Sequence, residues 1–282
     1  MNILPTLFVS HGSPMLSVED GTARRFLTSW SKQYPRPKVI LVVSAHWENT
    51  DGPAVSTTEQ PRTIHDFGGF PHELYEIQYP ATGAPEVAQQ TIKLLQDTGF
   101  KVGSNNSRGL DHGAWVPLRL MYPEADIPVF QVSLIRGAGP AEHYRLGAAL
   151  QPLREHEVLI MSSGSLTHNL HEIVGRGIDD PAPHWVTEFD NWVAQTLAAG
   201  KLSELINYRR LAPYAERNHP TEDHLLPLFV AMGAAGKDAI ATRVHASHTY
   251  GILAMDAYTF AEPSVSGASM DSTKLSSMAA HA

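Results

Sequence analysis

The amino-acid sequence predicts an α/β fold, a single domain with a central, mostly parallel or mixed sheet and helices on both of its faces. Short apolar runs rich in β-branched residues alternate with helix-length segments along the chain, as in sheets that helices cover. The 282 residues would suffice for one large α/β domain or two small ones. Because neither a linker nor an internal repeat divides them, we expect one domain over residues 1–260.

Four of the apolar runs are expected to be buried strands. Each has the length of a strand and the continuous apolar character that burial on both faces of a sheet produces. They are Leu4–Ser10, Val39–Ala45, Val129–Ser133 and Val158–Ser162.

Two helices have recognisable ends. The clearer one is expected over Pro85–Thr98, with proline at its start and Gly99 just past its end. The second lies within His219–Gly236, where Thr221 is a candidate N-cap and the two acidic residues after it suit the positive end of a helix. This start would place His224 in the first turn, although the proline three residues further on removes one backbone hydrogen bond.

Residues 261–282 are expected to form a disordered C-terminal tail. This stretch, which includes SVSGASMDSTKLSSMAAHA, consists of small and polar residues without periodicity. Such a segment buries too little apolar surface to offset the entropy of ordering it.

The composition excludes several classes of function. The 29 acidic residues exceed the 21 basic ones, and no basic cluster is larger than a pair, which argues against nucleic-acid and anionic-membrane partners. The absence of cysteine excludes disulfides, iron–sulfur clusters and thiol catalysis. Because no apolar run approaches a membrane span and no signal-peptide pattern opens the sequence, we expect a soluble, cytoplasmic protein. The oligomeric state cannot be inferred from these features.

The 15 histidines invite a search for a metal site. His11, His46 and His168 each come just after an expected strand, at the sheet edge where α/β proteins bind ligands. His224 would join them from the start of a helix. Either these residues are ordinary hydrogen-bonded loop histidines, or they converge on one metal ion. No short-range metal motif decides between the two, so convergence depends on the fold.

Six segments resemble the DOPA dioxygenase branch of the class III extradiol dioxygenases, the family related to protocatechuate 4,5-dioxygenase. The similarity extends from Leu4 to about Phe260, with the motifs in the family's order. They are SHGSP (Ser10–Pro14), SAHW (Ser44–Trp47), IHDFGGFP (Ile64–Pro71), LDHGAW (Leu110–Trp115), SGSLTHNL (Ser163–Leu170) and HPTEDHLLPL (His219–Leu228).

The resemblance implies a set of metal ligands. His11 and His46 match two ligand histidines of the family, and the third ligand, a glutamate in the protocatechuate branch, corresponds to His224 here. Three imidazoles suit zinc as well as Fe(II), whereas two histidines and a carboxylate would favour iron. Glu222 or Asp223 would supply that carboxylate if the helix began differently.

The resemblance also implies catalytic roles. His168 matches the family's acid/base residue and is close enough to the ligands to be considered as a fourth one. His112 matches a second active-site histidine that hydrogen-bonds the substrate or bound oxygen. In this interpretation the enzyme uses Fe(II) and O₂ to open the ring of an L-DOPA-like catechol. Zn competes for the same site and is expected to occupy it in the protein as purified.

The segment Ile64–Tyr79 offers aromatic surface for a flat substrate. His65 and Phe67 are the candidate substrate contacts, joined by Phe70, and Gly68-Gly69 would let the loop bend over the site. The alternative is that these aromatic side chains only pack the loop. Two other functions stay open, a zinc-dependent hydrolase with the same three histidines and a non-catalytic protein that binds a metal or an aromatic ligand.

Overall fold

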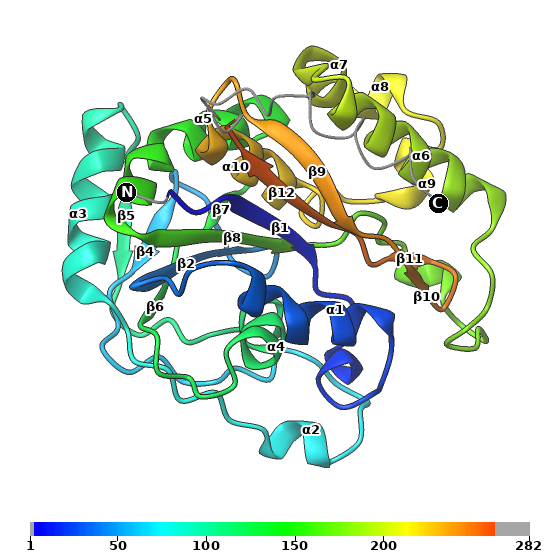
Figure 1. Ribbon diagram of the computed structural model, residues 1–282, viewed down its shortest axis with the longest axis horizontal. Coiled ribbons are helices and arrows are strands. Elements are labelled where there is room, and N and C mark those ends of the chain that lie inside the picture. The colour runs from blue at the N-terminus through cyan, green and yellow to red at the C-terminus, as the bar shows by residue number, and fades with distance from the viewer. Residues whose placement is uncertain (1–2, 263–282) are drawn as a thin grey trace, which may run out of the picture.

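A central sheet of six strands runs through the computed structural model, which describes residues 3–262 (Figure 1). In spatial order the strands are β6 (Val129–Gln131), β2 (Val39–Ser44), β8 (Val158–Gly164), β1 (Thr6–Ser10), β12 (Ala257–Ala261) and β9 (Ile240–His245). The first four are parallel, whereas β12 runs antiparallel to β1 and β9 antiparallel to β12. The expected mixed sheet is therefore confirmed.

Three pairs of short strands lie outside this sheet. They are β3 (Glu48–Asn49) with β7 (Leu134–Ile135), β4 (Ala54–Ser56) with β5 (Gly103–Asn105), and β10 (His248–Thr249) with β11 (Leu253–Ala254).

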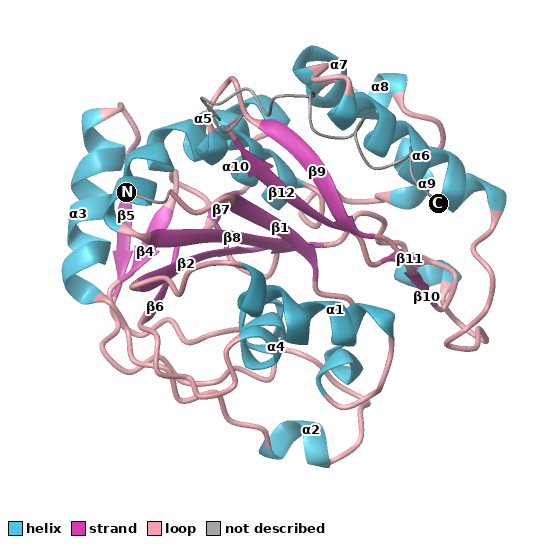
Figure 2. Ribbon diagram, viewed as in Figure 1, coloured by secondary structure: helices cyan, strands magenta, loops and turns pink. Residues whose placement is uncertain are grey.

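Helices cover both faces of the sheet (Figure 2). The helices are α1 (Thr22–Trp30), α2 (Glu73–Glu76), α3 (Pro85–Asp97), α4 (His112–Met121), α5 (Pro140–Leu150), α6 (His184–Ala198), α7 (Leu202–Ile206), α8 (Tyr208–Leu211), α9 (Ala215–Asn218) and α10 (Leu226–Ala235). Short 3₁₀ helices span Pro14–Ser17, Ser31–Gln33, Gln151–His156 and Leu170–Glu172. None of the helices in the described part of the chain has both the length and the apolar composition that a membrane crossing requires.

The two cores follow from the alternation of side chains along the strands. In β8, Val158 and Ile160 belong to the core beneath α3, α5, α6 and α10, while Leu159 and Met161 belong to the core beneath α1 and α4. Because this strand is buried on both faces, every residue in it is apolar or small, which is why the sequence predicts it so readily.

The expected strands and the expected first helix are present with small shifts at their ends. The first strand begins at Thr6, after Pro5, which has no N–H to contribute to a strand ladder. The helix α3 ends at Asp97, and Gly99 follows with a left-handed φ of 86°. Ala261 is the last residue of β12, and the expected tail from residue 263 onward lies outside the described residues.

The start expected for the last helix was wrong. Helix α10 begins at Leu226, so Thr221 is not its N-cap and His224 lies in the turn before the helix. Pro227 then occupies the first turn, where a missing N–H costs nothing because that group has no partner within the helix. The proline therefore sets the helix start four residues later than the capping pattern indicates, with Leu225 in place of Thr221 as the N-cap.

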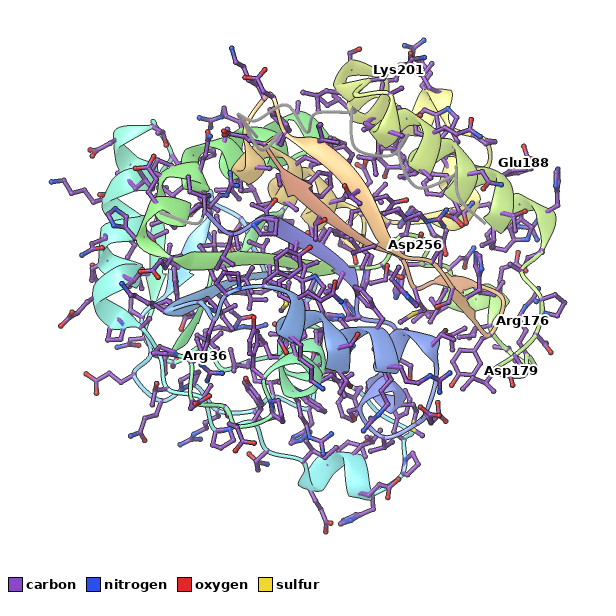
Figure 3. All side chains as sticks on the ribbon, in the orientation of Figure 1. Arg36, Arg176, Asp179, Glu188, Lys201 and Asp256 are labelled. Carbon is purple, nitrogen blue, oxygen red and sulfur yellow. The ribbon has the colours of Figure 1, made fainter. Side chains whose placement is uncertain are left out.

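A buried ionic cluster joins α6 to the antiparallel side of the sheet. Arg243 of β9 donates two hydrogen bonds to Asp190 of α6, at 2.7 and 2.8 Å, and a third to Asp256. Asp256 lies in the interior, whereas Glu188 and Lys201 lie at the outer edge of the molecule (Figure 3). The main-chain carbonyl of Asp256 accepts from the N–H of Ser10, so the cluster also supports the end of β1.

Helices α5 and α10 approach so closely that only glycine fits between them. A Cβ atom on Gly233 would lie 2.0 Å from the carbonyl oxygen of Tyr144, and one on Gly147 would lie 2.2 Å from that of Val230. We expect Gly233→Ala to lower the free energy of unfolding by about 1–3 kcal/mol, as overpacking does, despite the better helix propensity of alanine. Urea denaturation measures this, with Gly21→Ala, at a site with open space, as the control. Equal stability of the two variants would contradict the prediction.

Candidate metal centre and active site

His11 extends from the end of β1 and is held by both its main chain and its ring. Its N–H donates to the carbonyl of Gly164 at 2.9 Å, and its Nδ1 lies 3.0 Å from Oγ of Ser163. Because the Ser163 hydroxyl proton is donated to the carbonyl of Gly113, this Oγ can only accept from His11. His11 therefore carries its proton on Nδ1 and presents the lone pair of Nε2.

His46 lies just beyond β2 and is held by polar neighbours. Its N–H donates to Oγ of Ser44, whose hydroxyl donates to Asp111, and its carbonyl accepts from Arg108. Its Nδ1 lies 3.4 Å from a carboxylate oxygen of Asp66, which favours a proton on that nitrogen. Its Nε2 is then free to accept.

His224 is positioned by its main chain. The N–H of Ser165 donates to its carbonyl at 2.8 Å, and a Cβ atom on Gly164 would lie 2.1 Å from that oxygen, so the turn packs directly against the end of β8. The ring Nδ1 lies 2.5 Å from Oδ2 of Asp223, while the buried Nε2 has no hydrogen-bond partner within the described chain. A buried ring nitrogen without a partner is costly unless it binds an ion.

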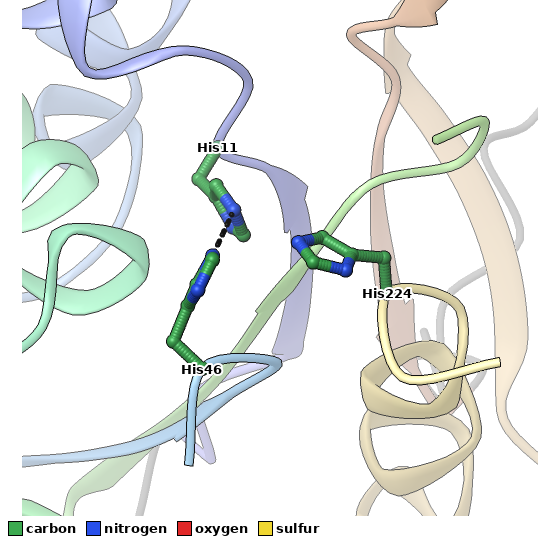
Figure 4. A group of neighbouring side chains, drawn as sticks. All are labelled: His11, His46 and His224. Carbon is green, nitrogen blue, oxygen red and sulfur yellow. Dashed lines mark hydrogen bonds between the residues drawn. The ribbon is translucent and has the colours of Figure 1, made fainter. Parts of the chain in front are cut away.

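The three histidines converge on one point (Figure 4). One nitrogen from each lies within 4.8 Å of the others, and the Nε2 atoms of His11 and His46 are 3.0 Å apart. Two nitrogens that each lie about 2.1 Å from a common ion, at a right angle, are about 3.0 Å apart. Lone pairs that face each other at this distance repel unless a cation lies between them, so the donor set fits a metal ion.

Electrostatics keep the imidazoles of His11 and His46 neutral. Burial, followed by repulsion from the neighbouring imidazoles, lowers the pKa of His11 well below its usual range and that of His46 to about 2. Both rings are therefore unprotonated on one nitrogen at neutral pH, as a metal ligand must be.

A second group, His46 with Asp66 and His112, also brings three donor atoms together. Its contacts are hydrogen bonds, however, because Asp66 accepts from both the main-chain N–H and the Nδ1 of His112, at 2.9 Å each. Burial opposes ionisation of Asp66, but these hydrogen bonds lower its pKa below the usual range. This second group therefore supports the histidine rings by hydrogen bonds. The buried nitrogen without a partner, Nε2 of His224, belongs to the group of His11, His46 and His224.

His168 lies in the loop after β8, where its N–H donates to the carbonyl of Asn218 at 2.9 Å. Its ring stacks on that of His224, with centroids 3.5 Å apart and planes 6° from parallel. Burial, followed by the His224 and His219 imidazoles, lowers the pKa of His168 to about 2. The structure thus places His168 beside the three-histidine group without making it a member of that group.

A cavity of about 410 Å³ opens beside the cluster, within the range of small-molecule sites. His11, His46, His112 and His168 line one side of it. The remaining wall is largely apolar and comes from four segments of the chain. It includes Pro14, Phe67, Phe70, Leu170, Ile173 and Leu253.

The aromatic loop contributes only part of what was expected. Phe67 and Phe70 line the cavity, but His65 does not: its Nε2 lies 3.0 Å from the carbonyl of Ile77, and its ring contacts Phe67 from behind. Tyr79 is buried in the core and donates its hydroxyl to the carbonyl of Tyr122. Gly69 has a φ of 80°, the left-handed conformation expected of a bend.

The sequence analysis did not identify two residues that support the histidine rings, nor part of the apolar wall of the cavity. Ser163 and Asp66 orient ligand rings, although both lie within motifs that the sequence analysis singled out. Leu170 and Ile173, which follow the histidine of SGSLTHNL, form part of the apolar wall of the cavity. The available signal was Leu170 itself, an apolar residue that ends a polar motif just beyond a strand.

Comparison with known proteins agrees with this geometry. Residues 5–260 match the family described as the catalytic LigB subunit of aromatic ring-opening dioxygenase. A protein from Escherichia coli K12 of known crystal structure, described as uncharacterized, superposes with a TM-score of 0.76 at 33% identity, over 91% of this chain and 99% of that one.

Two curated relatives carry the description 4,5-DOPA dioxygenase extradiol. The one from Beta vulgaris is 46% identical over 92% of this chain and 97% of its own length. The one from Escherichia coli K12 is 40% identical over 82% of this chain and 85% of its own length. The chain therefore belongs to the family of the catalytic LigB subunit of aromatic ring-opening dioxygenases, and it is an extradiol dioxygenase, an oxidoreductase.

Proposed function

We propose that the protein cleaves the ring of a catechol with O₂, using Fe(II) held by His11, His46 and His224. The observation that carries this proposal is the convergence of three Nε2 lone pairs whose Nδ1 atoms have other partners. Fe(II) bound there supplies the electron exchange between a chelated catechol and O₂, which a redox-inert ion cannot supply.

His168 and His112 handle protons in this proposal. His168, neutral at its lowered pKa, accepts a proton from a catechol hydroxyl and later returns it as an acid. The negative charge of a catecholate beside it would raise its pKa toward the working range. His112 lines the cavity and hydrogen-bonds the substrate or oxygen.

The substrate is a catechol with a short side chain, like the DOPA in the names of the relatives. Phe67 and Phe70 provide aromatic faces for its ring, and the apolar wall excludes water from the reacting atoms. His65, which contacts the ring of Phe67 and does not line the cavity, would then contribute to substrate binding indirectly.

Iron and zinc compete for this site. Three imidazoles contain no carboxylate to favour the harder ion, and zinc stands above Fe(II) in the general order of affinity, so protein purified in air is expected to carry zinc or little iron. We place the enzyme in the cytoplasm, whose reducing conditions would also help to keep iron ferrous.

Anaerobic exchange of the metal tests the function. We expect apoprotein loaded with Fe(II) to consume O₂ when DOPA, protocatechuate, caffeate or simple catechols are added, and to form a coloured ring-opened product from at least one of them. An oxygen electrode measures the uptake, and zinc-loaded protein should show none because zinc has no accessible redox change. Iron-loaded protein that consumes no oxygen with the whole panel would overturn the proposal, and hydrolysis by the zinc form under argon would support a hydrolase.

A further inference from the structure

We propose that Asp66 is a positioning residue that fixes the ring tautomers of two histidines at once, the metal ligand His46 and the cavity histidine His112. The inference rests on the proposed function only in taking His46 as a ligand. It assigns a task to a residue of the aromatic loop that lines the cavity and whose carboxylate lies beside both histidines.

The carboxylate of Asp66 lies close to three nitrogen atoms. One oxygen accepts from the main-chain N–H and from Nδ1 of His112, both at 2.9 Å, and the other lies 3.4 Å from Nδ1 of His46. A neutral imidazole has one N–H, so a proton held at Nδ1 leaves the lone pair at Nε2. In His46 this lone pair faces Nε2 of His11 and the metal position. In His112 the same tautomer provides an acceptor for a catechol hydroxyl.

Only a carboxylate can serve both rings. Both of its oxygens accept, whereas the amide of asparagine has one accepting oxygen and an NH₂ group that donates. An asparagine at position 66 would therefore leave one of the two rings facing a donor. If that ring were His46, its proton would move to Nε2, where it would compete with the metal.

The main chain just before Asp66 is anchored at Ile64. The N–H of Ile64 donates to the carbonyl of Leu110 at 2.7 Å, and Nε1 of Trp115 donates to the carbonyl of Ile64 at 3.0 Å. These contacts tie the loop to the start of α4, which carries His112. Phe67, the next residue, lines the cavity, so one short segment contacts the substrate space and orients a metal ligand.

Nuclear magnetic resonance of the zinc-loaded protein tests the proposal without relying on turnover. Long-range ¹H–¹⁵N correlation spectra of the histidine rings identify which nitrogen carries the proton. We expect His46 and His112 to carry it on Nδ1 in the unaltered protein. In Asp66→Ala, His112 should shift to the Nε2–H form that free histidine prefers. The Kd for zinc should rise by roughly 10–100-fold, as is usual when the hydrogen-bond partner of a ligand histidine is removed.

Two further variants separate the tautomer effect from general damage. Asp66→Asn keeps the shape of the side chain but can accept from only one of the two rings. It should either weaken zinc binding while His112 keeps its tautomer, or change the tautomer of His112 while zinc binding is kept. Asp223→Asn removes the corresponding carboxylate from His224, and it should weaken zinc binding without changing the tautomer of His112. If Asp66→Ala does not fold, the isosteric Asp66→Asn carries the test.

Unchanged ring tautomers in Asp66→Ala and Asp66→Asn, with zinc affinity within twofold of the original, would overturn the proposal. Coordination of the metal by an oxygen of Asp66 would also overturn it. Failure of the iron-loaded enzyme to consume O₂ would leave the tautomer result intact and remove only the proposed activity.

Discussion

The variant His11→Ala is expected to lose metal binding and catechol-dependent O₂ uptake together. His11 is 1% exposed, and its Nε2 directly faces that of His46, so its removal leaves two imidazoles and a void where the third ligand was. Tetrahedral zinc sites in small domains gain about 10–16 kcal/mol from four ligands, so one ligand contributes roughly 3–4 kcal/mol. This corresponds to a loss of about 10²–10³-fold in affinity.

Competition with a chromophoric chelator measures the affinity of His11→Ala, and circular dichroism checks that it folds. The control is His184→Ala, a histidine with a mostly exposed side chain at the start of α6. A His11 variant that retains one equivalent of iron with unchanged affinity would show that the three-histidine group is not the metal site.

Replacing His168 by alanine should have an effect of similar size on catalysis and little effect on the metal. A general acid–base residue contributes roughly 10²–10⁴-fold to kcat, and we expect a loss in this range with nearly intact iron content. The stacked position of His168 on His224 accounts for the expected separation, since a ring that lies parallel to a ligand need not share its metal.

Steady-state oxygen uptake and metal analysis of the same His168→Ala preparation distinguish the possible roles. Partial recovery of kcat by added imidazole, which fits the space left by the side chain, would strengthen the assignment as a proton carrier. Loss of iron in parallel with activity would instead make His168 a fourth ligand.

The parts of the fold that could be predicted are those whose physical cause is local. The strand β2 is an unbroken apolar run because helices bury both of its faces. By contrast, β9 lies at the edge of the sheet and is only partly buried, so polar residues such as Thr242 and Arg243 interrupt its pattern. The sequence accordingly gives no signal for the antiparallel side of the sheet.

The candidate site likewise has parts that the sequence could predict and parts that it could not. His11 and His46 could be placed together because parallel strands end at the same edge. The side chains that support the histidines could not, since Ser163 lies 152 residues from His11 in the sequence, and Asp66 lies 46 residues from its hydrogen-bond partner His112. The orientation of His65 away from the cavity depends on a contact within the loop that no residue pattern encodes.

The turn that carries His224 is fixed by its backbone, through the N–H of Ser165 and the close approach of Gly164. Neither contact depends on the side chain at position 224. Evolution can therefore exchange imidazole for carboxylate here by a single substitution while the attachment point stays where it is. The metal preference of the site can therefore change without any change in the backbone that positions the ligand.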